Sequence, residues 1–179
     1  MKENPWTTLS SKIVYKNPWI SIREDNVTCP DGKPGIYGVV QTVNATGVVA
    51  INDNNEIYLV GQYRYPTNTY SWEIIEGGGK PHETPLQTIQ RELAEEAGLT
   101  ALEWQQLGSI VYTSNCITDE KAYLYLARGL KEVPRNPDTT EILEIRVVPF
   151  AEAVSMVNEG EIQDAMSIIA ILRAERYLK

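Results

Sequence analysis

Short apolar stretches separated by polar turns recur along the first part of the chain and predict a β-rich region. Residues 13–15 form a short apolar run, and residues 19–27 alternate loosely between apolar and polar side chains. The composition of residues 29–35 (CPDGKPG) is typical of a turn. Residues 36–43 then return as an apolar stretch. We therefore predict a β-hairpin near the N-terminus.

The following apolar stretches are nearly continuous, which predicts strands buried on both faces. Residues 47–51 (GVVAI) and 56–63 (EIYLVGQY) are of this kind and flank the turn-like sequence NDNN. Further strands are predicted over residues 107–112, 121–127 and 141–148, and helices over 150–158 and 162–178. The last helix carries an apolar side that we interpret as core packing alone, formed by Ala165, Ile168, Ile169, Ile171 and Leu172.

These elements predict an α+β fold of the α/β/α sandwich type, in which a mixed β-sheet lies between helices. An N-terminal antiparallel β extension is expected to precede this sandwich. We place the N-terminal β region at residues 1–45 and the main domain at residues 46–179.

A glycine-rich turn followed by an acidic helix is the most unusual part of the sequence. The three glycines at 77–79 permit backbone angles closed to other residues and let the main chain approach a ligand. Thr84 is predicted to cap a helix over residues 86–97, with Pro85 at its first position. Gly98 is suited to end it.

The helix carries a cluster of carboxylates formed by Glu92, Glu95 and Glu96. Spacings of three and four residues place Glu92 on the same face as both others, where like charges repel. Grouped hard oxygen ligands suit Mg²⁺, or alternatively Mn²⁺. Arg91 lies beside the cluster and either pairs with Glu83 or orients a carboxylate. A solvated acidic surface helix is the alternative interpretation.

Composition narrows the class of partner. Sixteen Lys and Arg against twenty-four Asp and Glu give a formal net charge of −8, a poor match for a nucleic acid polymer. We expect a small anionic substrate instead. The sequence predicts no membrane segment and no secretory signal. Cys29 and Cys116 are far apart and show no metal-site or disulfide spacing, which favours a cytoplasmic protein with reduced thiols.

Taken as one pattern, the glycine turn and acidic helix resemble the signature of the Nudix hydrolase family. The matching positions are Gly77, Glu83, residues 91–93 (REL), residues 95–96 (EE) and residues 98–99 (GL). The resemblance implies a Nudix fold and a pyrophosphohydrolase that hydrolyses a phosphoanhydride with Mg²⁺. The implied metal ligands are Glu92, Glu95, Glu96 and the backbone carbonyl of Glu76.

Two segments before this signature resemble the ADP-ribose and nucleotide-sugar pyrophosphatase subgroup, namely residues 62–64 (QYR) and 71–77 (SWEIIEG). The implied substrate-binding residues are Arg64, Glu73, Gly77, Gly78 and Trp72. Arg64 would contact a phosphate, and Glu73 would act on the metal or position an arginine. For Trp72, stacking on a base and anchoring a core or interface both stay open.

The implied catalytic residues are Glu141, Glu144, Glu120, Arg91 and Glu95. A carboxylate is needed to take a proton from the attacking water. Glu141 is preferred as this base because it lies nearer the late loop, with Glu144 second and Glu120 third.

The implied substrate is ADP-ribose or a related ADP- or GDP-sugar, cleaved to a nucleoside monophosphate and a sugar phosphate. The loop at residues 113–120 (TSNCITDE) departs from the SPG-like run of the subgroup, since Asn115 and Cys116 follow Ser114. A dinucleoside polyphosphate or NADH-type substrate is therefore the alternative. A sensor that binds a nucleotide sugar without cleaving it is a third reading.

The subgroup often pairs its subunits through the N-terminal region, so we expect a homodimer. The alternative for this region is an edge extension of the main sheet.

Overall fold

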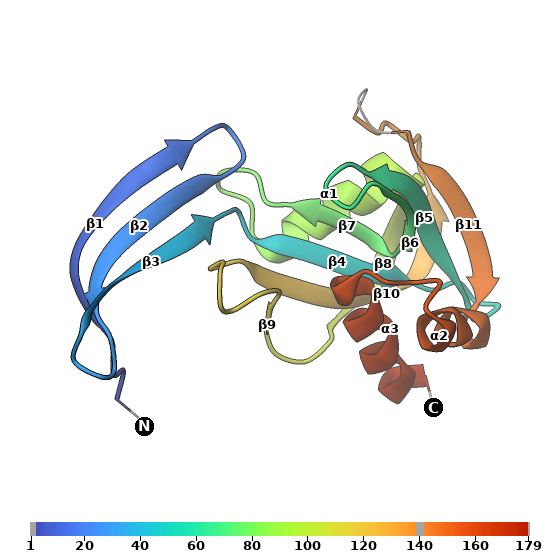
Figure 1. The fold of residues 1–179 in the computed structure, drawn as a ribbon. Coiled ribbons are helices and arrows are strands. Elements are labelled where there is room, and N and C mark those ends of the chain that lie inside the picture. Colours follow the sequence, from blue (N-terminus) through green and yellow to red (C-terminus); the bar gives the residue numbers. More distant parts are fainter. Residues whose placement is uncertain (1–2, 139–141, 179) are drawn as a thin grey trace. The chain divides into compact units, whose positions relative to one another are not determined.

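The computed structural model describes residues 3–138 and 142–178. The chain forms two compact units, drawn in Figure 1. The first, called here the N-terminal unit, comprises residues 1–43 and 112–121, and the second, the main unit, comprises residues 44–111 and 122–179. Each unit is described by itself below.

The N-terminal unit is built on a three-stranded antiparallel sheet. Its strands, in spatial order, are β1 (Thr7–Lys16), β2 (Ser21–Thr28) and β3 (Pro34–Gln41). Strands β2 and β3 form the predicted hairpin, with Thr28 opposite Pro34. The backbone N–H of Cys29 donates to the carbonyl of Lys33 at 2.8 Å and closes the turn. This hairpin prediction is confirmed.

The loop with the unusual Asn115-Cys116 sequence lies along β3 in the same unit. The N–H of Val40 donates to the carbonyl of Ile117 at 2.9 Å, and the hydroxyl of Thr118 donates to the carbonyl of Val40 at the same distance. The Tyr37 hydroxyl donates to the carbonyl of Cys116 at 2.8 Å. Strand β3 therefore holds the loop in place through backbone hydrogen bonding and two side-chain hydroxyls, and neither of these hydroxyls belongs to Asn115 or Cys116.

The main unit contains two sheets. The larger is mixed and consists of β7 (Ile75–Gly78), β4 (Ala45–Ala50), β10 (Lys121–Glu132) and β8 (Leu99–Gln106) in spatial order, with β9 (Val111–Tyr112) beside β10. Strands β4 and β10 are parallel, and the other described ladders are antiparallel. The smaller sheet orders β11 (Glu144–Pro149), β5 (Glu56–Arg64) and β6 (Thr69–Glu73), all antiparallel.

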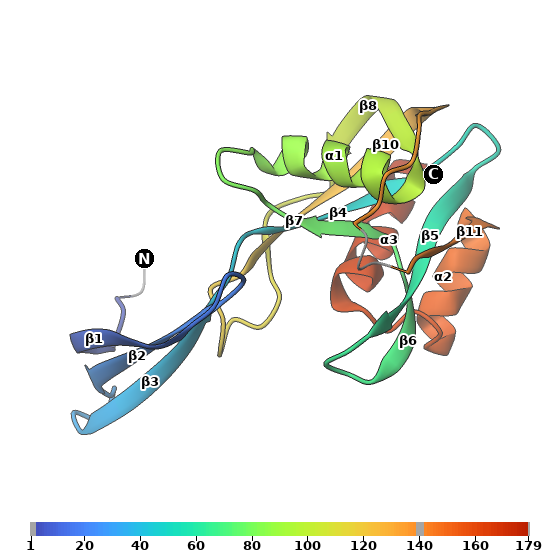
Figure 2. The same cartoon turned by 90° about the horizontal axis from the view of Figure 1, so that it is seen from above.

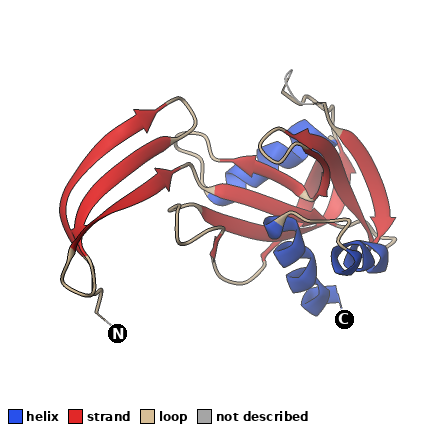
Figure 3. Ribbon diagram, viewed as in Figure 1, coloured by secondary structure: helices blue, strands red, loops and turns tan. Residues whose placement is uncertain are grey.

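Helices cover both faces of the larger sheet. In β4, Val48 and Ala50 face a core shared with α1 (Pro85–Ala97), whereas Val49 faces a core shared with α2 (Phe150–Glu159) and α3 (Ala165–Leu178). Successive strand side chains point to opposite faces, so a nearly all-apolar strand serves both cores. Figure 2 shows α1 and α3 on opposite sides of β4 and β7, and Figure 3 separates helices from strands by colour. The predicted α/β/α sandwich is confirmed.

One strand prediction is wrong. We expected a strand over residues 107–112, but strand β8 occupies Leu99–Gln106, and only Val111 and Tyr112 of the expected range form a strand. Gly98 ends α1 in the left-handed conformation and turns the chain directly into β8. The apolar pattern of β8 is weak because most of its side chains are exposed. Among the described residues, no helix has the length and apolar character needed to cross a membrane.

Candidate active site

The acidic helix begins and ends as its sequence predicts. Thr84 caps α1, and its side chain accepts from the N–H of Gln87, while the Gln87 side chain accepts from the N–H of Thr84. Pro85 stands at the first helical position. Gly98 closes the other end with φ 66°, an angle that favours glycine. These caps fix the rotation and length of the helix that carries the carboxylates.

Gly77 has a steric role that the sequence alone does not reveal. It lies at the end of β7, and a side-chain carbon added there would be 2.2 Å from both Cγ and Cδ of Glu92. Only a residue without a side chain permits this approach. The carboxylate of Glu92 therefore rests against the backbone of the glycine turn, and the first glycine is required for that contact.

Arg91 is the cation at the centre of the cluster. Its guanidinium donates to both carboxylate oxygens of Glu83, from Nε to Oε1 at 2.9 Å and from Nη2 to Oε2 at 3.0 Å. Its Nη1 lies 2.8 Å from Oε1 of Glu92 and 2.8 Å from Oε2 of Glu95. Nη2 also donates to the carbonyl of Gly78 at 3.2 Å. Both alternatives proposed for Arg91 therefore occur together.

These contacts shift the ionisation of the two partners. Hydrogen bonds from Arg91 lower the pKa of Glu83 to about 2, with a smaller contribution from the backbone N–H of Lys80. The hydrogen bond to Glu83 raises the pKa of Arg91 above its ordinary value. Glu83 is thus ionised and Arg91 charged at neutral pH, so the arrangement is electrostatically fixed.

The chain folds back over the last turn of α1. Gly98 donates its N–H to the carbonyl of Ala94, Asn136 donates its N–H to that of Glu95 at 3.1 Å, and Arg135 donates its Nε–H to that of Glu96. Three of the carbonyls that a helix end leaves open are therefore satisfied. Glu96 itself is only 4% exposed. No basic residue lies in the last turn of α1, so Arg135 supplies the cation there.

Arg64 and Glu73 form an ion pair between β5 and β6. Nε of Arg64 donates to both oxygens of Glu73 at 3.0 Å, and its Nη2 donates to Oε2. Glu73 is buried, whereas the Arg64 side chain is 41% exposed. The hydrogen bond to Glu73 raises the pKa of Arg64. This contact is what one of the two roles left open for Glu73 requires, that of positioning an arginine, and a role toward a metal ion stays a prediction.

Glu76 turns its carboxylate toward α3. Its Oε1 accepts from the hydroxyl of Ser167 at 3.0 Å. Burial, followed by the neighbouring carboxyl of Asp164, raises the pKa of Glu76 well above its ordinary value. Asp164 and Ser167 were not predicted as functional residues. The one sequence signal for them is the order Asp-x-x-Ser at the start of a helix, which is typical of an N-cap.

Trp72 and Glu144 belong to the smaller sheet. Trp72 is partly buried. The centroid of its ring lies 5.7 Å from the ring centroid of Tyr70 and 5.7 Å from the guanidinium carbon of Arg146. Glu144 is exposed at the start of β11, where its Oε2 accepts from the Tyr70 hydroxyl at 2.9 Å. These contacts connect Glu144 to the neighbouring aromatic side chains of β6.

Two other predicted bases lie elsewhere in the chain. Glu120 belongs to the N-terminal unit, where it accepts from the hydroxyl of Thr113 at 2.6 Å and from that of Thr42 at 3.3 Å. Glu141, the preferred base, lies outside the described residues. The described part of the main unit therefore brings together the glycine turn, the α1 carboxylates and Arg91, and the choice of base among the three glutamates stays a prediction.

The donor set fits a divalent cation in its chemistry. Within residues 3–138 and 142–178, no three His, Cys, Asp or Glu side chains converge as a ready-made metal-ligand group. Arg91 instead bridges Glu92 and Glu95. Mg²⁺ nonetheless prefers hard oxygen donors and is usually held by a few protein oxygens together with water and substrate phosphates. The carboxylates of α1 are donors of this kind, and that of Glu92 lies against the glycine backbone.

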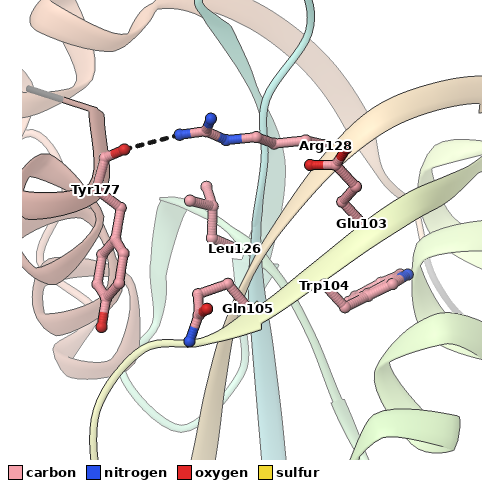
Figure 4. Close-up of a pocket in the computed structure, with 6 residues that line it drawn as sticks. All are labelled: Glu103, Trp104, Gln105, Leu126, Arg128 and Tyr177. Atoms are coloured by element: carbon pink, nitrogen blue, oxygen red, sulfur yellow. Dashed lines mark hydrogen bonds between the residues drawn. The ribbon is translucent and has the colours of Figure 1, made fainter.

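The main unit also has a surface hollow separate from these residues. It is lined by Glu103, Trp104, Gln105, Leu126, Arg128 and Tyr177. In Figure 4, Arg128 reaches past Leu126 to the carbonyl of Tyr177, at 2.8 Å. None of the predicted site residues that the structure describes is among those that line this hollow. Arg128 serves there as a cap for the end of α3.

Comparisons with known proteins agree with this geometry. The NUDIX domain model matches residues 41–168, and a model of the nucleoside diphosphate sugar hydrolase N-terminal domain matches residues 6–40. The chain belongs to the Nudix family, as its sequence pattern predicted.

The chain is 35% identical to ADP-ribose pyrophosphatase of Mycobacterium tuberculosis (strain ATCC 25618 / H37Rv), over 96% of this chain and 84% of that protein. It is 31% identical to ADP-ribose pyrophosphatase of Bacillus subtilis (strain 168), over 96% and 93%. The crystal structure of an ADP compounds hydrolase superposes with a TM-score of 0.85, at 18% identity, covering 99% of this chain and 96% of that one. That likeness confirms the predicted fold.

Proposed function

We propose that the chain is a pyrophosphohydrolase that uses a divalent metal ion to cleave a nucleoside diphosphate linked to a second moiety. ADP-ribose or a related ADP- or GDP-sugar is the proposed substrate, and a nucleoside monophosphate and a sugar phosphate are the products. The observation that carries this proposal is the contact of Gly77 with Glu92, beside a cluster organised by Arg91. The names of the two relatives support the substrate class.

Mg²⁺ is the proposed metal, held by Glu92, Glu95 and Glu96 together with the backbone carbonyl of Glu76. When bound, such an ion neutralises phosphate charge and activates water for an in-line attack. Arg91 keeps the carboxylates of Glu92 and Glu95 grouped around one guanidinium. We assign Arg91 and Glu95 to the catalytic set because their contact organises the carboxylates that would hold the metal ion.

Arg64 is the proposed phosphate contact. Its guanidinium is held from behind by buried Glu73, which leaves a half-exposed planar cation available to an oxyanion. Gly77 and Gly78 allow the substrate to approach the backbone of the turn. Trp72, which is partly buried, completes the proposed substrate-binding set.

The base that accepts a proton from the attacking water is proposed among Glu141, Glu144 and Glu120. A base must come within hydrogen-bonding reach of that water, directly or through a second water. Separate Gln substitutions identify it, because only loss of the true base lowers kcat while the KM for substrate is retained. A matched control is Glu132→Gln, at the exposed end of β10.

We also propose that the protein is a homodimer paired through the N-terminal unit. Every residue of β1 is exposed in the single chain, although the strand carries Leu9, Ile13, Val14 and Tyr15. Exposed apolar surface of this kind marks interaction sites. Sedimentation equilibrium tests the proposal, which predicts a dimer that Ile13→Asp converts to monomer.

The substrate is tested by a Mg²⁺-dependent hydrolysis panel with products separated by chromatography. The panel contains ADP-ribose, ADP-glucose, GDP-mannose, a diadenosine polyphosphate, NADH and nucleoside triphosphates. Preferential release of AMP from ADP-ribose is expected. Preference for the diadenosine compound or NADH would reassign the loop at residues 113–120 to another specificity. Thermal stabilisation by nucleotide sugars without product would indicate a sensor.

A further inference from the structure

A buried serine links the start of α3 to the strand that carries the glycine turn. Ser167 has no exposed surface. Its hydroxyl oxygen accepts from the backbone N–H of Ile74 at 3.1 Å and donates to Oε1 of Glu76 at 3.0 Å. The donor and an acceptor site of this hydroxyl are both in use, and a satisfied buried polar contact favours a single arrangement of its partners.

Asp164 fixes the serine in turn. Its Oδ2 accepts from the backbone N–H of Ser167 at 2.7 Å, and its carbonyl accepts from the N–H of Ile168 at 3.0 Å. This is the geometry of a helix N-cap, which satisfies the donors that the first turn leaves open. The position of the Ser167 hydroxyl is therefore set by the start of the helix, and the serine is not free to change partners.

Neighbouring residues of β7 face opposite layers of the sandwich. Glu76 points toward α3, where Ser167 holds its carboxylate. Gly77 lies against the carboxylate of Glu92 on α1. Consecutive residues of a strand face opposite sides of the sheet. Fixing the side chain of Glu76 on one side therefore also fixes the backbone of Gly77 on the other. A continuous path of contacts thus leads from Asp164 on one face to Glu92 on the other.

We propose that Ser167, held by Asp164, is a positioning residue for the metal-binding turn. By fixing the side chain of Glu76 on the α3 face, it sets the backbone of Glu76 and Gly77 against the carboxylate of Glu92. This inference rests on the proposed function, in which Glu76 and Glu92 hold the metal ion. Residues that support metal ligands from behind typically change metal affinity by roughly 10- to 100-fold when they are lost.

The test is a calorimetric titration of the protein with Mn²⁺ alone, without nucleotide. Wild type is compared with Ser167→Ala and with Ser155→Ala as the matched control. Ser155 is also a helical serine that donates to a glutamate, Glu159 at 2.9 Å, but it lies exposed on α2. We expect Ser167→Ala to bind Mn²⁺ roughly tenfold more weakly than wild type and Ser155→Ala to bind it normally.

The possible outcomes separate this inference from the proposed function. A wild-type protein that does not bind Mn²⁺ would refute the metal site itself. Normal Mn²⁺ affinity in a folded Ser167→Ala variant, beside a wild type that binds, would refute only the positioning role. The expected loss of Mn²⁺ affinity in Ser167→Ala would support the positioning role, whichever nucleotide the enzyme cleaves.

A second pair of variants covers the case in which Ser167→Ala does not fold. Asp164→Ala removes the cap of Ser167, whereas Asp164→Asn keeps an oxygen acceptor for its N–H. The proposal predicts weakened Mn²⁺ binding in the alanine variant and rescue in the asparagine variant. It also predicts a raised Mg²⁺ requirement with little change of kcat at saturating Mg²⁺. Equal Mn²⁺ affinity in the two variants would overturn it.

Discussion

Three carboxylates, those of Glu83, Glu92 and Glu95, are grouped around one guanidinium, and that grouping explains how an acidic helix remains stable. Glu92 and Glu95 would repel each other on an isolated helix. Arg91 lies 2.8 Å from each of them and holds Glu83 through two further hydrogen bonds. The sequence pattern singled out these residues, but it did not reveal that one arginine contacts all three carboxylates.

Gly77→Ala tests the steric contact with Glu92. A methyl group at this position would lie within the van der Waals radius of the Glu92 side chain, so the helix or the turn must shift. We expect about 1–3 kcal/mol loss of unfolding free energy and at least about 100-fold loss of kcat/KM. Gly79→Ala is the stability control, because a carbon there meets Thr88 Oγ1 at an ordinary 3.5 Å. Wild-type activity in Gly77→Ala would contradict this account.

The pH dependence of stability follows from Glu83. Its pKa is about 2 in the folded protein, lowered by hydrogen bonds from Arg91, against 4.5 ordinarily. A carboxyl with a lowered folded-state pKa stabilises the protein fully above the unfolded value, and this stabilisation is lost as the pH falls from about 4.5 toward 2. Glu83→Gln should therefore flatten the acid side of the stability curve in urea titrations. An unchanged slope between pH 4.5 and 2 would show that the pair does not contribute.

At the level of elements, the two ends of α1 are set by the residues that cap them and by a later segment that contacts its last turn. The cap at Thr84 and the stop at Gly98 follow from local sequence rules and were predicted. The contact of Arg135 with the last turn of α1 was not predicted, because Arg135 is far along the chain from Glu96 and no periodic pattern links the two residues. Contacts between distant segments depend on how the sheet orders its strands, which local propensity does not encode.

Arg135→Ala tests the cover of the α1 C-terminus. The guanidinium supplies a donor to the carbonyl of Glu96 and a cation near the negative end of the helix dipole. Its loss should lower the unfolding free energy by about 1 kcal/mol, measured by urea denaturation. Arg135→Lys should recover part of the loss, since the charge remains. Lys131→Ala, at an exposed site on β10, should have little effect.

Local sequence patterns do not reveal contacts between distant segments, and for this reason the contact of α3 with Glu76 was not predicted. Core packing was predicted for Ala165, Ile168, Ile169, Ile171 and Leu172, but only Ile171 of these is buried, Ile168 and Ile169 are partly buried, and Ala165 and Leu172 are exposed. The buried face of α3 is formed instead by Met166, Ser167, Ala170, Ile171 and Ala174. Ser167 sits within that buried face and reads as a small core residue from sequence. Its function becomes visible only when Glu76, from a strand distant in the sequence, is found beside it.

At the scale of the whole molecule, the sequence predicted the sandwich because strands such as β4 are apolar on both faces and need helices on each side. It predicted the carboxylate cluster because that cluster is contiguous in sequence. It could not assign the catalytic base, because a base must be brought to the cluster from another part of the chain. Glu144 and Glu120 lie on different units, where each has its own hydroxyl partner.

Metal binding should stabilise the folded protein as a whole. A ligand that binds only the native state adds about 2.7 kcal/mol at a concentration one hundred times its Kd. Mg²⁺ should therefore raise the Tm by several degrees, which differential scanning calorimetry measures, and EDTA should reverse the shift. Glu92→Gln and Glu96→Gln should reduce it. An equal Tm with Mg²⁺ and EDTA in wild type would contradict the proposed metal site.

The central claim, that the α1 carboxylates support metal-dependent hydrolysis, is tested most directly by the initial rate of AMP release from ADP-ribose across a Mg²⁺ titration. Wild type is compared with Glu92→Gln and with Glu103→Gln, an exposed glutamate on β8. We predict Mg²⁺-dependent AMP release in wild type and Glu103→Gln, and a loss of at least about 100-fold in Glu92→Gln. Full turnover by Glu92→Gln would contradict the account.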